Sequence, residues 1–362
     1  MDRTELSSPP PDMKKPLHEA QRRRLPAEWE DQDGVLIAWP HAGTDWGPHI
    51  EEVEPVFVEI AKTISLFERC LIVVSSEEHR PADLLSKAGA VMERVRFHAA
   101  PIDDTWARDF GPITVEKGGQ LLLLDFVFNG WGGKFAARRD NAVTRTLWQR
   151  GAFGKTRIEP VDFVMEGGSI ESDGRGTLLT TSRCLLNPNR NAGRSREEIE
   201  RMLAPLLGAG RFLWLENGRL EGDDTDSHVD TLARFAPCDT IVHVACPEAT
   251  DPHFADLQAM AAELKAFRTR EGRPYRLLPL PWPSPRFDEE GGRLPATYAN
   301  FLVINGAVLV PTYGDPNDAE ALNAIGQAFF GRRMIGIPCL PLIQQHGSLH
   351  CVTMQLPRGA FP

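Results

Sequence analysis

Short apolar runs separated by polar turns divide most of the chain into alternating strand and helix segments. Runs rich in β-branched residues and Leu, bounded by Gly, Asp or Asn, are typical of strands. They occur at 34–39, 69–74, 111–115, 120–128, 177–181, 240–246, 300–305, 307–313 and 350–356. Longer segments with helical spacing of apolar positions occur at 50–67, 195–208, 254–270 and 318–330. We therefore predict an α/β protein.

The same kind of unit recurs along the chain. Turn-plus-strand segments near residues 34, 109, 167, 228, 300 and 347 are separated by roughly 50 to 75 residues, somewhat more than the ~40–50 of known propeller blades. Each interval holds strands and one helix. About five such units would fill the chain, and a ring of them would bring loops that are distant in sequence to one axis. Residues 1–24 are polar and contain three consecutive prolines, so we expect a flexible tail followed by a single domain over 25–362.

The composition restricts the kinds of molecule that the protein could bind. The net charge of −10 disfavours nucleic acid, whose phosphates require a basic face, and is compatible with a small cationic ligand. The chain has no apolar run near the roughly 18 residues of a membrane span, and no signal sequence. The six cysteines form no C-x-x-C pair. We expect a cytoplasmic protein with reduced cysteines and no membrane association. The sequence does not determine its oligomeric state, and a homo-oligomer is compatible with it.

The densest polar cluster is LEGDDTDSHVDTLARF, residues 220–235. His228 and Asp230 are two residues apart, so on a strand they would share a face. Such a pair can place a base beside a carboxylate that binds a cation. The acidic loop is also compatible with a Ca²⁺ or other metal site, which leaves open a metal-dependent hydrolase or a Ca²⁺-stabilised binding protein.

Other candidates are scattered along the chain. Trp106 and Asp109 precede a strand, and an indole ring can stack on a planar cation. Glu166 is followed by two glycines, which allow close backbone approach beside its carboxylate. Cys351 stands at the start of the last expected strand, where it is a packed residue or a nucleophile, and the neighbouring His350 would point to the opposite face. A Cys, a His, several carboxylates and an aromatic ring suit a cationic, planar substrate.

The ordered motifs EWEDQDGVLIAWP, WARDFGP, FNGWGGKF, EGGSIESDGRGTLLTT, CLLNPNRN, GDDTDSHVD, YANFLVINGAVLVPTYGD and HCVTMQLP carry a resemblance over nearly the whole folded chain. Together the sequence resembles the agmatine deiminase and Porphyromonas-type peptidylarginine deiminase family of the guanidine-modifying superfamily. The resemblance implies a five-bladed pseudo-symmetric α/β propeller of ββαβ-type units, and it implies neither a metal nor a cofactor.

The resemblance also implies roles for particular residues. Cys351 would be the nucleophile and His228 the general acid and base. Asp109 and Asp230 would clamp the guanidinium, with Glu166 as an additional carboxylate and Trp106 as a wall of the substrate slot. Asp224 is our candidate for binding the far amine of agmatine.

The chain departs from the family pattern near the nucleophile. Agmatine-specific members typically read Gly-Gly-Gly before the final Asn-x-His-Cys, whereas this chain reads QQHGSLHC with His346, Gly347 and Ser348. Ser227 also stands where the family has Gly before the catalytic His. These departures affect the loop around the nucleophile and so the choice of guanidine.

The leading prediction is hydrolysis of agmatine to N-carbamoylputrescine and ammonia through a covalent Cys intermediate. The alternatives are a deiminase of free or peptidyl arginine, an amidino transfer, and the metal-dependent or Ca²⁺-stabilised protein named above.

Overall fold

The structure is a computed structural model that describes residues 22–75 and 80–361. Most of the expected tail, residues 1–21, lies outside the described residues. Arg23–Arg24 form strand β1, which pairs antiparallel with β5 (Ile113–Lys117). Arg23 also forms an ion pair with Glu159 at 2.7 Å. The folded part therefore already includes residues 23 and 24, which we had assigned to the tail.

The described strands form six sheets, and five of these contain three or four strands. Two sheets have four strands, in the spatial orders β19 (Thr353–Pro357), β2 (Gln32–Ala38), β3 (Arg69–Val74), β4 (Val95–Ala99), and β1, β5, β6 (Gln120–Val127), β7 (Arg157–Val164). Two sheets have three strands, in the orders β10 (Arg211–Leu215), β9 (Thr177–Thr181), β8 (Ile170–Ser172), and β11 (Ala233–Ala236), β12 (Thr240–Val244), β13 (Arg276–Leu280). A further three-stranded sheet has the order β16 (Leu302–Ile304), β17 (Ala307–Thr312), β18 (Arg333–Pro338). A small ribbon joins β14 (Arg286–Phe287) to β15 (Arg293–Leu294).

The five larger sheets share one connection. An antiparallel pair is followed by a helical crossover and a strand parallel to the second member, as in β16, β17 and β18. The helices are α1 (Ile50–Phe67), α2 (Arg80–Ala88), α3 (Ala107–Phe110), α4 (Gly130–Gly133), α5 (Val143–Gln149), α6 (Ser182–Leu185), α7 (Pro188–Asn191), α8 (Arg196–Leu207), α9 (Phe254–Ala266) and α10 (Asp318–Gly326). The chain is an α/β protein, as predicted.

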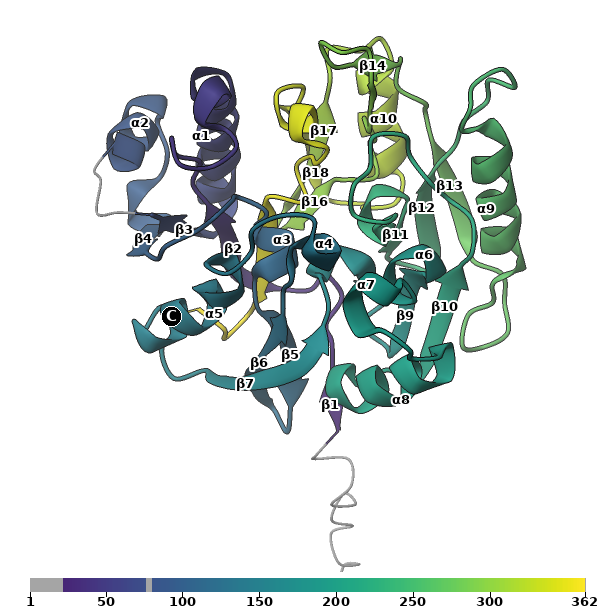
Figure 1. The fold of residues 1–362 in the computed structure, drawn as a ribbon, viewed down its shortest axis with the longest axis horizontal. Coiled ribbons are helices and arrows are strands. Elements are labelled where there is room, and N and C mark those ends of the chain that lie inside the picture. The colour runs from purple at the N-terminus through teal and green to yellow at the C-terminus, as the bar shows by residue number, and fades with distance from the viewer. Residues whose placement is uncertain (1–21, 76–79, 362) are drawn as a thin grey trace, which may run out of the picture.

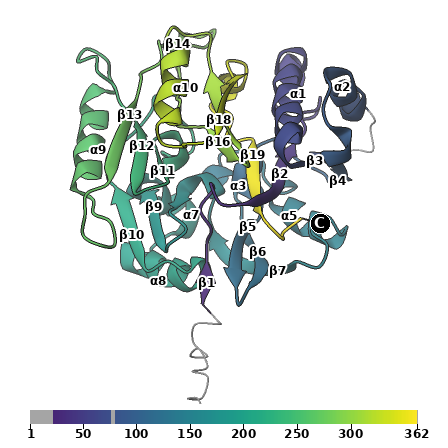
Figure 2. The ribbon, with the colours of Figure 1, turned by 180° about the vertical axis from the view of Figure 1, so that it is seen from behind.

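The longer helices lie on the outside, whereas the short helices α3, α4 and α7 gather in the middle of the view (Figure 1). Seen from behind, the segment between β1 and β2 runs across the middle of the molecule (Figure 2). Two apolar clusters form the core. Among the described helices, none is long and apolar enough to cross a membrane.

Local sequence explains the well-predicted elements. Helix α1 has Glu51 and Glu52 in its first turn, which favours its positive end, and buries Phe57, Ile60 and Ile64 at helical spacing. Helix α8 begins with a capping box between Ser195 and Glu198 and ends at Gly208 with φ 68°, a left-handed conformation that suits glycine. The outer strands β4, β7, β13 and β18 escaped prediction because most of their residues are partly buried or exposed, which weakens the apolar pattern.

Two local expectations were wrong, and both concern the candidate site. The last strand begins at Thr353 rather than at residue 350, so His350 and Cys351 lie in a turn and not on opposite faces of a strand. His228 and Asp230 are not on a strand either. His228 precedes a short 3₁₀ helix, η5 (Val229–Thr231), that contains Asp230.

Candidate active site

Cys351 lies in the turn before β19 with 5% of its surface exposed. The side-chain oxygen of Asn300 organises this turn. It accepts hydrogen bonds from the backbone N–H of His350 at 2.8 Å and of Cys351 at 3.3 Å, and lies 3.4 Å from the Cys351 Sγ. Asn300 therefore fixes the thiol in place, a role that the sequence did not reveal because the residue sits at the start of an ordinary apolar strand segment.

Asp109 and Asp230 reach the same space from two different elements. Asp109, on α3, accepts hydrogen bonds from the Gly168 backbone N–H at 3.0 Å and the Trp131 indole N–H at 2.9 Å. The Asp230 Oδ2 lies 2.7 Å from the His350 Nδ1 and 4.0 Å from the Cys351 Sγ. Its buried Oδ1 has no hydrogen-bond partner among the described residues.

Gly168 opens the space between these groups. A Cβ at this position would lie 2.5 Å from the His228 Nδ1, 2.9 Å from the Asp109 Oδ1 and 3.2 Å from the Asp230 Oδ1. These three polar atoms thus converge on one small volume that any larger residue would fill. Both ring nitrogens of the buried His228 lack a hydrogen-bond partner in the described structure. The nearest carboxylate oxygens are Asp109 Oδ1 at 3.6 Å from Nδ1 and Glu166 Oε2 at 4.0 Å from Nε2.

Glu166 lies behind His228 and is held by Arg190. The Arg190 Nε is 2.9 and 3.0 Å from the two Glu166 oxygens, and its Nη1 is 2.6 Å from Asp226. Both Glu166 and the Arg190 side chain are completely buried. Glu166 is therefore one partner of a fixed ion pair that contributes negative charge beside His228.

The pKa values of these groups diverge because their neighbours differ. Burial raises the pKa of Asp109 to about 6, although the nearby His228 opposes the shift. Burial also raises the pKa of Asp230, but the hydrogen bond and charge of His350 outweigh it, so that pKa lies below its usual range. For His228, burial lowers the pKa, but Asp109, Cys184 and Glu166 outweigh it and the net pKa is well above the usual value.

Cys351 is a protonated thiol in this environment. Burial, and after it the charges of Asp230 and Asp109, hold the pKa of Cys351 well above its usual value. A cation placed between those carboxylates would neutralise their effect and favour the thiolate. A positively charged ligand between these carboxylates would therefore favour ionisation of the Cys351 thiol.

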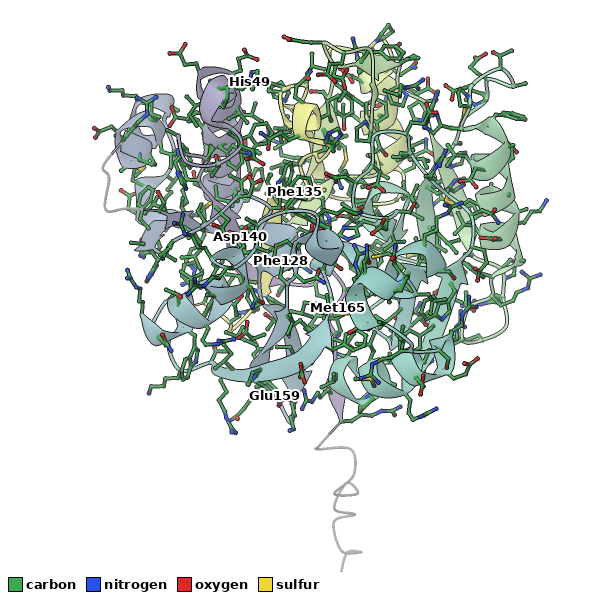
Figure 3. All side chains as sticks on the ribbon, in the orientation of Figure 1. His49, Phe128, Phe135, Asp140, Glu159 and Met165 are labelled. Atoms are coloured by element: carbon green, nitrogen blue, oxygen red, sulfur yellow. The ribbon has the colours of Figure 1, made fainter. Side chains whose placement is uncertain are left out.

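A cavity of about 330 Å³ leads to Cys351 and Asp109. Its wall contains the aromatic residues Trp106, Trp131 and Phe135 and the acids Asp45, Asp104 and Asp224. Phe135 follows α4 and lies near the centre of the view in Figure 3. The Trp131 ring packs against both Phe135, at 5.4 Å between ring centroids, and Phe128, at 5.0 Å. The predicted residues Trp106 and Asp224 therefore line the same cavity as Cys351.

The departure at 346–348 also borders this cavity. Gly347 is retained, and a Cβ there would lie 2.1 Å from the Trp106 ring. His346 has φ 66° and lines the cavity wall. Ser348 is buried with its hydroxyl 3.0 Å from that of Tyr313. His346 thus places an imidazole in the wall of this cavity.

Among the described residues, positive side chains neighbour both the acidic loop and the group that could hold a metal ion. In the acidic loop, the Asp223 carboxylate accepts backbone N–H groups of the loop, and Asp226 binds Lys134 and Arg190. Glu166, Cys184 and His228 have ligand atoms within 4.8 Å of one another. However, the Arg190 guanidinium bound to both Glu166 oxygens opposes a second cation there.

Comparison with known proteins identifies the family of the chain. The family model of the Porphyromonas-type peptidyl-arginine deiminases matches residues 24–357. The agmatine deiminase of Stutzerimonas stutzeri (strain A1501) is 33% identical, covering 92% of this chain and 95% of its own. A solved structure from Porphyromonas gingivalis, proposed to be an arginine deiminase, is 49% identical, with a TM-score of 0.90 over 94% of this chain and all of its own.

A third relative carries a ligand. It is the C. jejuni agmatine deiminase with Cys replaced by Ser and substrate bound, 38% identical, with a TM-score of 0.86 over 93% of this chain and 97% of its own. The fold and the relatives define the class: this chain is a deiminase, a hydrolase that acts on carbon–nitrogen bonds. More narrowly, it belongs to the Porphyromonas-type peptidyl-arginine deiminase family.

Proposed function

We propose that the protein hydrolyses agmatine to N-carbamoylputrescine and ammonia. The observation that carries this proposal is the cavity in which a buried thiol lies beside two carboxylates and below a mouth lined by acids. A guanidinium ion is planar and always charged, so carboxylates can hold it in one orientation through its N–H groups.

The reaction requires only groups that are present. When the cation binds, Cys351 loses its proton to solvent and the thiolate sulfur adds to the guanidinium carbon. His228 donates a proton to the leaving nitrogen, the C–N bond breaks, and ammonia departs. Water, deprotonated by His228, then attacks the covalent amidino-thioether, the C–S bond breaks, and a substituted urea is released with Cys351 restored.

The mouth of the cavity favours a substrate with a second positive group. Asp45, Asp104 and Asp224 would attract the amine of agmatine and repel the carboxylate of free arginine. Burial raises the pKa of Asp104 to about 7, and the charge of Asp45 adds to this shift, although the backbone N–H of Thr105 opposes it. A nearby ammonium group would therefore favour the ionised form of Asp104. We assign the amine contact to Asp224, as the sequence suggested, with Asp104 and Asp45 beside it.

We also infer that the five larger sheets are the five blades of one propeller, arranged around an axis that passes through the site. The shared antiparallel-then-parallel strand order of these sheets supports this arrangement. The single domain over residues 25–362, the cytoplasmic location and a homo-oligomeric state remain predictions.

The test is ammonia release from agmatine by the purified protein, beside Cys351→Ser and beside a chelator control. We expect release from the wild type, no change with chelator, and a loss of more than about 10³-fold in Cys351→Ser, because serine is a far weaker nucleophile at a guanidinium carbon. Release from arginine or an arginyl peptide in preference to agmatine would contradict the substrate assignment. Loss of activity with chelator would contradict the metal-free mechanism.

A further inference from the structure

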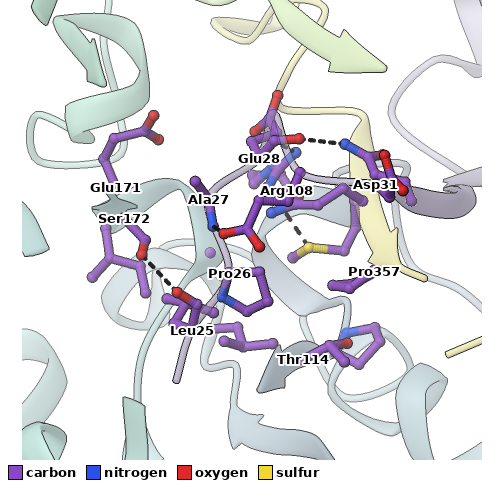
Figure 4. A pocket seen from close by; sticks show the side chains of 18 residues that line it. Leu25, Pro26, Ala27, Glu28, Asp31, Arg108, Thr114, Glu171, Ser172 and Pro357 are labelled. Carbon is purple, nitrogen blue, oxygen red and sulfur yellow. Dashed lines mark hydrogen bonds and ion pairs between the residues drawn. The ribbon is translucent and has the colours of Figure 1, made fainter. Parts of the chain in front are cut away.

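A second group of charged side chains lies behind the site, and the mechanism above makes no use of it. It contains Glu28, Arg108, Glu171, Arg234 and His350, each with no more than 6% of its surface exposed. Glu28 comes from the segment between β1 and β2 that crosses the back of the molecule. Figure 4 shows Glu28 beside Arg108 in this region. Burying so many charges is costly unless each is paired, so their arrangement calls for an explanation.

The group forms a continuous chain of contacts that ends at Asp230. The His350 Nδ1 lies 2.7 Å from the Asp230 Oδ2, and its Nε2 lies 2.7 Å from the Glu28 Oε2. Glu28 is fixed in turn by the Val303 backbone N–H at 2.7 Å and by Arg234 at 2.8 Å. Arg234 also binds Glu171 at 3.0 Å. The imidazole thus bridges an anchored carboxylate and the candidate substrate carboxylate.

The chemistry of the carboxylate determines which group donates the hydrogen bond between His350 and Asp230. An ionised carboxylate can only accept hydrogen bonds, so the His350 Nδ1 carries a proton and donates it. The other nitrogen lies 3.0 Å from the Arg234 Nη2, from which it can accept, and a second ring proton there would be accepted by Glu28. In either protonation state the Nδ1–H···Oδ2 bond to Asp230 persists.

This bond leaves one Asp230 oxygen for the substrate. Oδ2 is occupied by His350, while Oδ1 is buried, has no hydrogen-bond partner in the described part of the chain, and lies 3.2 Å from where a Cβ of residue 168 would be. We propose that His350 is a positioning residue that orients Asp230 toward the guanidinium, and that Glu28 anchors His350 from the back of the site. The inference rests on the proposed function, because it assigns Asp230 to the binding of a guanidinium.

Two substitutions of His350 separate this role from simple packing. The side-chain amide of Asn can take the place of Nδ1, whereas that of Gln reaches the place of Nε2. We therefore expect His350→Asn to keep KM for agmatine within about fivefold of the wild type. His350→Gln should raise KM by about 10- to 100-fold, more than it lowers kcat, which corresponds to the loss of one hydrogen bond to a charged group.

The matched control is His243→Gln. His243 is equally buried, but its ring bonds to the backbone oxygen of Val244 in strand β12, in a different sheet from β19. This variant should lower the melting temperature without changing KM. Equal KM values for His350→Asn and His350→Gln, with both proteins folded, would overturn the proposal.

A double-mutant cycle tests the part assigned to Glu28. Glu28→Gln should raise KM by about 3- to 10-fold in the wild type and have no effect on KM in the His350→Gln background, because Glu28 acts through His350. Additive effects of the two substitutions would show that Glu28 acts by another route.

A second readout does not need the substrate. In protein labelled with ¹⁵N-histidine, we expect a ring Nδ1–H signal protected from exchange that disappears in both His350 variants and shifts in Glu28→Gln. If the wild type releases no ammonia from agmatine, the proposed substrate is wrong, while this signal still decides the His350 proposal. A His350 ring without a protected Nδ1–H would overturn it.

Discussion

Asp109 and Asp230 are both almost completely buried and both face the space above Gly168, yet the groups that bind them differ in charge. Asp109 receives its hydrogen bonds from an indole and a backbone amide, which are neutral donors. Asp230 is bonded to His350, behind which lie Arg234 and Arg108. Burial dominates at Asp109 and raises its pKa, whereas the bond to His350 overcomes burial at Asp230 and lowers its pKa.

The difference shows that the depth of burial alone does not set the charge of a carboxyl group. At neutral pH the Asp230 carboxylate is a fixed anion, maintained by the group behind it. The Asp109 carboxyl titrates near the working range of an enzyme and depends on what enters the cavity. Asp230 therefore provides permanent charge, whereas Asp109 provides charge that a bound cation would reinforce.

The largest effect is expected from removing the permanent charge. Asp230→Asn should lower kcat/KM for agmatine by about 10³-fold and Asp109→Asn by about 10²-fold, since disrupting a buried charge pair costs several kcal/mol. Steady-state kinetics of both variants measures the ratio. A larger loss in Asp109→Asn than in Asp230→Asn would contradict the assignment of the permanent charge to Asp230.

The pH dependence of kcat/KM at acidic pH should come from Asp109 alone. As the pH falls through about 6, Asp109 gains a proton and loses its attraction for the guanidinium, so kcat/KM should fall with an apparent pKa near 6. Asp230 stays ionised over the same range. Asp109→Asn should flatten this acidic limb, while an unchanged limb in that variant would assign the titration to another group.

Stability should change in opposite directions in the two variants. The folded-state pKa of Asp109 is about 6 against an ordinary 3.8, so the stability associated with it is lost as the pH rises between these values. Asp109→Asn should therefore stabilise the protein at pH 7 by about 1 kcal/mol, after allowing for one lost acceptor.

The pKa of Asp230 is lowered, so its contribution is present above 3.8 and lost at lower pH. Asp230→Asn should destabilise the protein at pH 7 by about 1–3 kcal/mol. Denaturant unfolding at pH 7 measures both changes, and changes of the same sign would contradict the electrostatic difference between the two carboxyls.

The smallest effect concerns the backbone before Asp230. Asp226 and Ser227 have φ values of 65° and 68°, a left-handed conformation that costs a non-glycine residue about 1 kcal/mol. Ser227→Gly should stabilise the protein by about 0.5 kcal/mol, because the relief of strain exceeds the added freedom of the unfolded chain. Thermal unfolding checks this change, and Ser227→Ala, which keeps the strain, is its control. Equal stability of the two variants would show that the loop carries no strain.

Much of this site could be predicted from motifs, but not its organisation. The motifs pointed to Cys351, His228 and Asp109, and the structure brings these residues together. Their chemical roles remain predictions. His350 was set aside because a strand was expected to turn it away from Cys351. The Asn300 hydrogen bonds delay the strand until Thr353, and this interaction between distant segments leaves no periodic signal in the sequence.

Buried ion pairs are another feature that sequence patterns cannot reveal. Glu28, Arg190 and Arg234 look like ordinary surface charges in the sequence, since charged residues are almost never fully buried unless paired. Their partners lie at least 24 residues away in the sequence. The outer strands β4, β7, β13 and β18 were missed for a simpler reason, because half-exposed parallel strands lack a clear apolar run.

Strand β19, which begins two residues after Cys351, pairs with β2 in a distant part of the sequence, and His350 meets Glu28 across 322 residues. Local opening of the β2–β19 edge would therefore displace Cys351 and His350 together. The integrity of the site is thus tied to the pairing of two segments that only the folded chain brings into contact.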